Sequence, residues 1–209
     1  MHLLKEQIFS AETDINEMQF IKKIYGIRRI PEYFLRLLYA MHQLALTEEE
    51  KAETGIIYVS HLGPVKQVHK YVDDLLTYPP EQCSPAYFSQ SVFNAPVAFL
   101  TKYLNMNGSS LCVCGFQKII DSSILTAYSW LKTCYCKKIL LVFSDDISDI
   151  AGTISDLTGL KLFQSTHILL LENTGTGSTD NGDTFTVKKL IEKIKQQHNL
   201  CGGHLNDIG

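Results

Sequence analysis

The sequence has no excess of basic residues. It contains 19 Lys and Arg against 22 Asp and Glu, which gives a formal net charge of -3 over 209 residues. The basic residues are scattered rather than clustered. General nucleic-acid binding depends on concentrated Lys and Arg, because their contacts with phosphates release counterions. The composition therefore argues against a nucleic-acid partner.

Long apolar runs are also missing. The run after Lys138 spans only residues 139–143 before acidic residues return, whereas a helix that crosses a bilayer needs roughly 20 apolar residues. Residues 1–7 lack the charged region followed by an apolar stretch that a secretory signal requires. We therefore expect a cytoplasmic protein without a membrane partner.

The cysteines form no Cys-x-x-Cys motif. They are Cys83, Cys112, Cys114, Cys134, Cys136 and Cys201. Nothing marks the chain as secreted, so we expect reduced thiols rather than a disulfide framework. Zinc binding by the two Cys-x-Cys pairs is the alternative. However, Cys112 and Cys114 fall on one face of an expected strand, whereas structural zinc ligands more often lie on turns. We expect no metal and no cofactor.

The pattern of apolar residues predicts alternating helices and strands. Hydrophobic residues make up 45% of the sequence, as in proteins that bury a core. Helices are expected through the first fifty residues and at 65–76, 92–104, 117–131 and 185–198. Strands are expected at 56–60, after Gly108, at 138–144 and at 166–172. This order predicts an α/β protein, with a mixed and mostly parallel sheet between two helical layers in a three-layer α/β/α arrangement.

A turn-rich segment, residues 173–183, follows the last expected strand. It lacks the Gly-Lys-Ser/Thr and the glycine spacing of nucleotide-binding loops, so nucleotide binding is not expected there. We expect residues 1–172 to form the main domain. Residues 173–209 are expected to form a turn-rich segment followed by a C-terminal helix.

The most informative local pattern is centred on Gln117. Residues 105–117 predict a glycine turn and a short buried strand, and residues 118–131 predict a helix. A thiolate at such a strand-to-helix turn would be a nucleophile activated by the helix N-terminus. The amide of Gln117 cannot be one, although it can satisfy backbone groups at the turn. The simpler interpretation is that Gln117 begins an exposed helix.

Two segments, residues 84–96 and 108–131, together resemble the N-terminal half of the β-ketoacyl synthases, which have a thiolase-like fold. Ser84-Pro85, Asn94-Ala95-Pro96 and the Gly108 turn follow one another in the order and spacing of that family. The resemblance covers about residues 25–172 and is closest to the short chain-length-factor group. It places Gln117 at the nucleophile position. Ser109 replaces the usual proline, and Gly115-Phe116 replaces the usual Thr-Ala.

The resemblance implies that residues 1–172 are half of a thiolase-like fold without catalytic residues, because Gln117 replaces the nucleophile. The family's catalytic histidines and lysine come from a C-terminal half, and this sequence ends before such a half begins. We therefore expect a non-catalytic chain-length factor that forms a heterodimer with a full-length ketosynthase. It would shape that enzyme's acyl pocket in fatty-acid, polyketide or polyene biosynthesis, and would meet acyl carrier protein only indirectly.

The same resemblance implies two sets of site residues. Family members dimerise by pairing the strand before the nucleophile, so the candidates for the dimer interface are Phe93, Asn94, Leu111, Cys112, Val113 and Cys114. The candidates that line the acyl pocket and limit chain length are Tyr87, Phe88, Ser91 and Gln117. Ordinary core packing is the alternative role for these residues.

Two other functions remain open. The chain can be a small cysteine-dependent acyltransferase or thioesterase, in which His61 or His69 activates Cys83, Cys112 or Cys114. No recognised nucleophile motif surrounds these cysteines. The chain can also be a scaffold or interaction protein that has no role in acyl chemistry.

Overall fold

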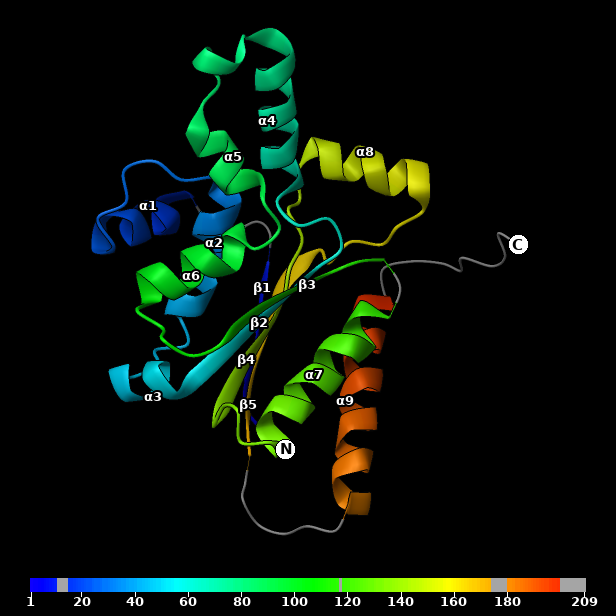
Figure 1. Cartoon of the computed structure of the whole chain (residues 1–209). Coiled ribbons are helices and arrows are strands. Elements are labelled where there is room, and N and C mark those ends of the chain that lie inside the picture. The colour runs from blue at the N-terminus through cyan, green and yellow to red at the C-terminus, as the bar shows by residue number, and fades with distance from the viewer. Residues whose placement is uncertain (11–14, 117, 174–179, 200–209) are drawn as a thin grey trace.

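The computed structural model describes residues 1–10, 15–116, 118–173 and 180–199 (Figure 1). The strands are β1 (His2–Ser10), β2 (Thr54–Ser60), β3 (Ser110–Cys114), β4 (Lys138–Phe143) and β5 (Ser165–Glu172). The helices are α1 (Ile15–Ile24), α2 (Glu32–His42), α3 (Glu48–Glu53), α4 (Val65–Thr77), α5 (Pro85–Ser91), α6 (Ala95–Leu104), α7 (Ile119–Lys132), α8 (Asp149–Thr158) and α9 (Asp180–Asn199), with a 3-10 turn, η1, at Pro80–Gln82.

The strands form one sheet in the order β1-β5-β4-β2-β3. Strand β2 is parallel to both β3 and β4, whereas β5 is antiparallel to β4 and β1 is antiparallel to β5. Strands β2, β3 and β4 therefore end at the same edge of the sheet. Strands β1 and β3 are the two edge strands of the sheet.

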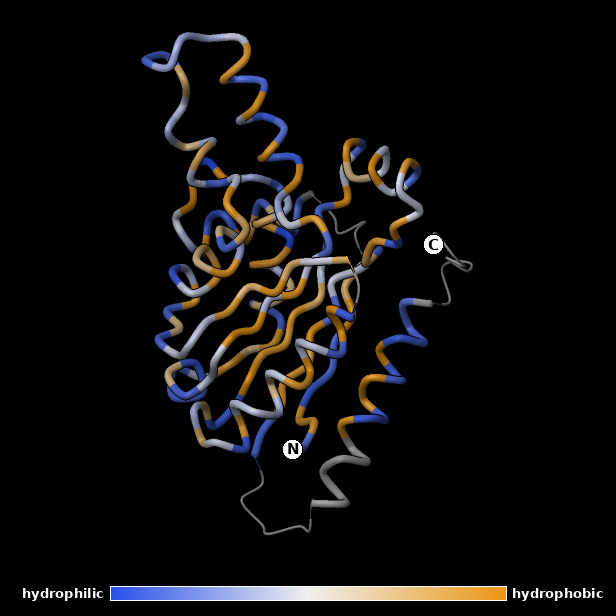
Figure 2. Tube along the Cα trace, turned by 45° about the vertical axis from the view of Figure 1, so that its right-hand side comes forward, coloured by the Kyte–Doolittle hydropathy of each residue, from blue (hydrophilic) through white to orange (hydrophobic). Residues whose placement is uncertain are grey.

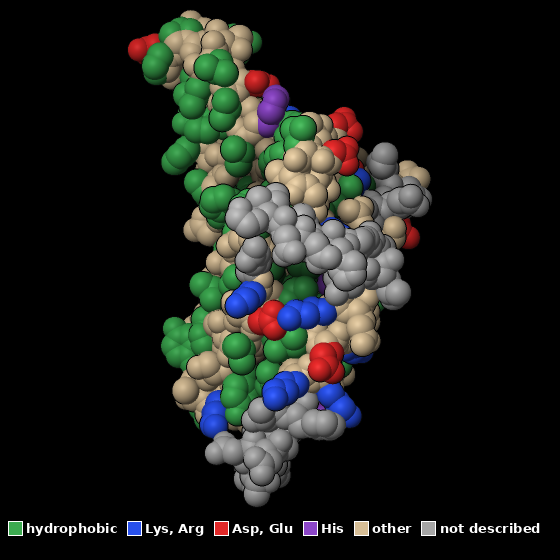
Figure 3. All heavy atoms as spheres, turned by 90° about the vertical axis from the view of Figure 1, so that its right-hand side faces the viewer, with side chains coloured by type: hydrophobic (Ala, Val, Ile, Leu, Met, Phe, Trp, Pro, Cys, Tyr) green, Lys and Arg blue, Asp and Glu red, His purple; other side chains and the backbone are tan. Residues whose placement is uncertain are grey.

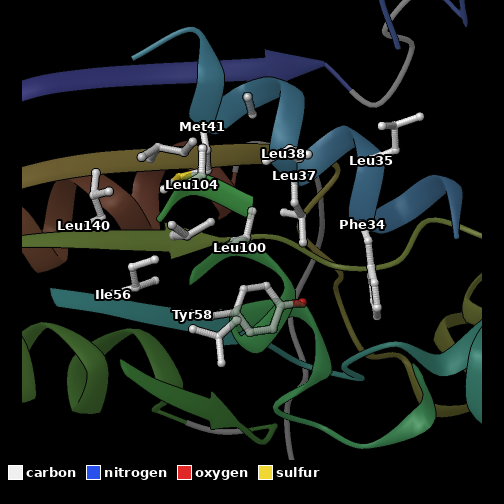
Figure 4. Close-up of a cluster of buried hydrophobic side chains, with 14 of the residues drawn as sticks. Phe34, Leu35, Leu37, Leu38, Met41, Ile56, Tyr58, Leu100, Leu104 and Leu140 are labelled. Atoms are coloured by element: carbon white, nitrogen blue, oxygen red, sulfur yellow. The ribbon is translucent and has the colours of Figure 1, made fainter. Parts of the chain in front are cut away.

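The central strands are buried on both faces. Every residue of β2 is buried, as in sheets that helices cover on both sides. On one face, side chains of β2, β4 and β5 pack against α1, α2 and α6 (Figure 4). On the other face, the alternate residues of the same strands pack against α7 and α9. Figure 2 shows the apolar strands between helices that each have a polar side. The expected three-layer α/β/α arrangement with a mixed sheet is confirmed.

Gly108 allows β3 to begin beside β2. A Cβ atom at this position would lie 2.2 Å from the backbone oxygen of Thr54, which is too close for any side chain. The adjacent Ser109 oxygen accepts a hydrogen bond from the Ile56 N–H at 2.9 Å. The glycine predicted to precede this strand is therefore required by the close approach of two backbones.

Three elements differ from the sequence-based expectations. Residues 2–10 form an edge strand rather than a helix, because β5 supplies their hydrogen bonds and only one long side of the strand is paired. Helix α5 occupies residues that were expected to form a loop. Helix α8 does so too, although it carries local signals: Ser148 caps its N-terminus, and Gly159 ends it with a positive φ of 67°.

None of the described helices has both the length and the apolar composition needed to cross a bilayer.

Candidate functional site

Helices α4 and α5, with η1 between them, project beyond the sheet as an arm (residues 65–91; Figure 1). The Ser84 N–H donates to the Asp74 carboxylate at 2.6 Å, which holds the loop after η1 against α4. The rings of Tyr71 and Phe88 pack with centroids 5.5 Å apart, which joins the two helices. Gln67 is the one buried residue of α4. The arm therefore adds surface to the molecule rather than core.

The arm exposes several large hydrophobic side chains. Its exposed large hydrophobic residues are Val72, Leu75, Leu76, Tyr78 and Phe88. Figure 3 shows hydrophobic side chains gathered on the arm at the top of the molecule. The exposed set continues beyond α5, because Phe93 is 58% exposed. Exposed hydrophobic side chains that gather in one region can mark an interaction site.

Strand β3 is the sheet edge next to this surface. It pairs with β2 alone, so its outer side has no strand partner among the described residues. Leu111 and Val113 pack towards the layer of α7 and α9, whereas Cys112 packs towards the layer of α2 and α6. All residues from Leu111 to Cys114 are half-buried. Other side chains therefore pack on both faces of β3, whereas its outer backbone groups have no strand partner among the described residues.

Phe93 connects the edge strand to the arm. Its backbone oxygen accepts a hydrogen bond from the Cys112 thiol at 3.0 Å. Its ring lies against Gly63, where a Cβ atom would come within 2.7 Å of the ring and 3.9 Å of the Cys114 sulfur. The sulfurs of Cys112 and Cys114 are 3.4 Å apart. Of the predicted interface residues, the structure thus brings Phe93, Cys112 and Cys114 together.

Asp145 organises the neighbouring carboxyl ends of β2 and β4. Its carboxylate accepts hydrogen bonds from the Ser60 hydroxyl (2.6 Å), the His61 N–H (2.7 Å) and the Phe163 N–H (2.9 Å). Its second oxygen lies 2.8 Å from His61 Nδ1. The Asp145 side chain is fully buried. It therefore fixes the backbone turn that leads into the arm.

A second buried polar cluster lies beside Asp145. The hydroxyls of Tyr33 and Tyr58 contact each other, and both donate to the backbone oxygen of Ser144. Burial raises the pKa of both tyrosines well above the ordinary value. Burial also raises the pKa of Asp146, whose carboxylate accepts the Lys66 N–H. The tyrosines stay protonated near neutral pH, and their hydroxyls link α2 and β2 to the end of β4.

The turn after β3 matches the predicted strand-to-helix pattern. Strand β3 ends at Cys114, and α7 begins at Ile119 after Lys118, whose φ of 56° is left-handed. Gln117 itself lies outside the described residues, so the prediction that places it at the nucleophile position stays a prediction.

The acyl-pocket candidates other than Gln117 lie together on α5. Tyr87 and Ser91 are half-buried, and Phe88 is 55% exposed. The Ser91 hydroxyl donates to the backbone oxygen of Phe88 at 2.9 Å. Asn94, an interface candidate, is exposed at the start of α6. These side chains therefore face a surface of the chain rather than its sheet core.

The histidines weighed for cysteine catalysis contact carboxylates. His61 lies against Asp145, and His69 lies 3.1 Å from Asp73 on the exposed side of α4. The Cys83 thiol donates to backbone oxygens around η1. Within the described ranges, no three His, Cys, Asp or Glu side chains form a metal-binding group.

Sequence reasoning missed Asp145 and Ser60 as an organising pair. The signal was present, since Asp145 and Asp146 directly follow the buried run of β4 and Ser60 ends the buried run of β2. Polar residues at the carboxyl ends of parallel strands converge on one edge of the sheet. The pairing itself depends on the order of the strands, which the sequence did not provide.

Comparisons with known proteins agree with this architecture. A family profile described as "Beta-ketoacyl synthase, N-terminal domain" matches residues 18–151. A search of curated proteins found no sequence match. Among solved structures, one chain of a complex between a ketosynthase and its chain length factor from Xenorhabdus doucetiae is similar at a TM-score of 0.59 and 18% identity, with 91% of each chain covered.

Two further structures have the same fold. The ishigamide ketosynthase/chain length factor is similar at a TM-score of 0.65 and 13% identity, and the match covers 80% of this chain and 50% of that one. A beta-ketoacyl synthase from Burkholderia phymatum is similar at a TM-score of 0.53 and 11% identity, over 85% of this chain and 47% of that one. The chain thus spans about half the length of these two.

Proposed function

Because the chain belongs to the β-ketoacyl synthase family, whose N-terminal domain it matches, we propose that it is a non-catalytic subunit of the chain-length-factor type. It pairs with a full-length ketosynthase and shapes the acyl pocket of that enzyme during fatty-acid, polyketide or polyene biosynthesis. Acyl carrier protein meets the complex through the ketosynthase.

The observation that carries the proposal is the open edge of β3 beside an apolar arm. An unpaired edge strand presents free backbone groups that favour pairing with another chain. The nearby Phe88 and Phe93 expose 55% and 58% of their surface. A partner that adds a strand to β3 and packs on the arm would cover both features. The ketosynthase complexes with the same fold support this choice of partner.

The position of Gln117 supports a non-catalytic role. The described residues on both sides of it form the strand and the helix that flank the nucleophile in the sequence resemblance. A glutamine amide has no nucleophilic form at neutral pH. We infer that the acyl chain is carried by the partner's cysteine, and that this chain contributes only walls and contacts.

The candidates for those walls are Tyr87, Phe88 and Ser91. All three lie on α5, which packs on α4 rather than on the sheet. Phe88 is the largest exposed side chain among them, so it can extend into a cavity of a bound partner. Its ring would then set the depth available to the growing chain.

Co-purification with a ketosynthase tests the pairing. We expect the wild-type chain to form a stable complex, and Phe93→Asp to abolish it although the variant chain still unfolds cooperatively in urea. Leu157→Asp is the matched control, because Leu157 is 81% exposed on α8. This control should bind like wild type. A wild-type chain that never binds a folded ketosynthase would refute the proposal.

Product analysis tests the pocket. In the reconstituted complex, Phe88→Ala should shift the products to longer chains, because it removes volume from the proposed wall. Gln117→Ala should retain activity, since the nucleophile belongs to the partner. If the isolated chain is labelled by an acyl thioester on a cysteine that turnover requires, the cysteine-dependent acyltransferase or thioesterase replaces this proposal.

A further inference from the structure

Cys112 and Cys114 form a close thiol pair on the open edge of the sheet. They are two positions apart on β3, so their side chains share one face of the strand. Two strand residues advance about 6.6 Å along the chain, yet the two sulfurs are only 3.4 Å apart. Both side chains therefore lean towards each other. Both residues are half-buried rather than enclosed in the core.

The pKa values of the two thiols shift in opposite directions. The adjacent Cys112 thiol, whose S–H can turn from the Phe93 oxygen to the Cys114 sulfur, lowers the pKa of the Cys114 thiol, in opposition to burial, which raises it. The same contact, together with burial, raises the pKa of Cys112. A single S–H between two sulfurs stabilises one thiolate and opposes the second. Cys114 is therefore the thiol that ionises first and attacks an electrophile.

We propose that Cys112 and Cys114 are a modification site, a reactive dithiol that low-molecular-weight disulfides of the glutathione type convert into an intrastrand disulfide. The Cys114 thiolate attacks one sulfur of the small disulfide, breaks its S–S bond and releases one thiol. Cys112 then loses its proton and attacks the Cys114 sulfur of the mixed disulfide, which releases the second thiol. The protein loses two electrons and two protons, and the small disulfide gains both.

The spacing makes this disulfide possible but labile. Disulfides bridge Cα atoms about 4.4–6.8 Å apart and Cβ atoms about 3.5–4.5 Å apart. Two residues along a straight strand are about 6.6 Å apart, so β3 must bend to close this bond, and the closed bond is strained. Strained or exposed disulfides are the readily reduced ones. Strand β3 has one neighbouring strand, so it can bend more easily than β2 or β4. Thiol reductants should therefore reopen the bond.

Closing the disulfide also changes the surface beside it. The Cys112 thiol donates to the backbone oxygen of Phe93, and this hydrogen bond ends when the thiol is oxidised. The Phe93 ring and the Cys114 sulfur both lie beside Gly63, so the movement of the sulfurs changes the surroundings of the ring. If β3 pairs with a ketosynthase, the oxidised chain binds it more weakly. This consequence rests on the proposed function, whereas the reactivity of the dithiol does not.

The test uses the isolated full-length chain in glutathione redox buffer, with alkylation, peptide mapping and intact mass as readouts. Wild type should lose two alkylatable thiols at positions 112 and 114, lose the mass of two hydrogens and recover both after treatment with dithiothreitol. Cys112→Ser should instead retain one glutathionyl group on Cys114. Cys134→Ser is the matched control at an exposed thiol, and it should form the same disulfide as wild type.

A second measurement needs no variant. Phenylarsine oxide, a trivalent arsenical that prefers paired thiols, should protect both cysteines of the wild-type chain from alkylation. If the folded wild-type chain accumulates only mixed disulfides and the arsenical gives no protection, the inference is wrong. A chain that closes the disulfide but never binds a ketosynthase when reduced would refute the proposed function and leave the dithiol assignment supported.

Discussion

Removing the Asp145 carboxylate should destabilise the fold more than any surface substitution. The fully buried carboxylate accepts hydrogen bonds from the Ser60 hydroxyl and from the N–H groups of His61 and Phe163, and it contacts the His61 ring. Hydrogen bonds to a charged group contribute about 1.5–3 kcal/mol each but are not additive. Removal of the carboxylate also leaves these buried donors without an acceptor, at about 1–3 kcal/mol each. We therefore expect Asp145→Ala to cost about 4 kcal/mol.

Asp145→Asn removes the carboxylate but keeps the shape of the side chain. The Phe163 N–H and the His61 ring meet one carboxylate oxygen, while the Ser60 hydroxyl and the His61 N–H meet the other. Either orientation of an amide leaves one backbone N–H facing an NH₂ group. An unsatisfied buried donor costs about 1–3 kcal/mol, so Asp145→Asn should lie between wild type and Asp145→Ala, at about 2 kcal/mol.

Urea unfolding followed by far-ultraviolet circular dichroism measures these differences, with the slope of free energy against urea checked for constancy. Asp156→Ala is the matched control, because Asp156 is exposed on α8. It should stay within about 0.5 kcal/mol of wild type. If Asp145→Ala costs less than about 1 kcal/mol, Asp145 does not organise the ends of β2 and β4.

Two further predictions concern packing and pH. Gly108→Ala should cost about 2–3 kcal/mol in urea unfolding, because its Cβ would press on the Thr54 backbone. Gly152→Ala on α8 is the control, since its Cβ would meet free space and should not destabilise the fold. Equal effects of the two substitutions would contradict the close approach of the Gly108 and Thr54 backbones. Burial lowers the pKa of His198 to about 4, from about 6.5 in an unfolded chain. The neutral ring's stabilisation is complete above pH 6.5 and is lost as the pH falls towards 4. After discounting for partial exposure, His198→Gln should reduce the stability lost between pH 7 and pH 5 by about 1 kcal/mol, and unchanged pH dependence would count against the buried histidine.

The elements predicted correctly carry dense local signals. Strands β2 and β4 are continuous apolar runs, and α4 and α7 have apolar residues at helical spacing, so each was identified within a few residues. Strand β1 was missed because Lys5 and Glu6 interrupt its apolar pattern, and its pairing partner, β5, lies more than 150 residues away. Helix α8 was missed although Ser148 and Gly159 mark its ends.

The candidate site likewise contains residues that the sequence selected in advance and a residue, Asp145, that it did not. The resemblance selected Phe93, Cys112 and Cys114 in advance, and the structure places these three together. Its assignments for Tyr87, Phe88 and Ser91 concern contacts with a second chain, so they remain predictions. The role of Asp145 could not be predicted, because Asp145, Ser60 and Phe163 come from three separate segments of the chain.

By itself the sequence determined the family and the layered α/β class and predicted the replacement of the nucleophile by Gln117, because each depends on residue types at local spacing. Only the tertiary structure decided that β5 runs antiparallel, that β3 is an open edge beside an apolar arm, and that two thiols on it lie 3.4 Å apart. Strand order, exposure and side-chain distance arise from contacts between distant segments, and local patterns do not encode them.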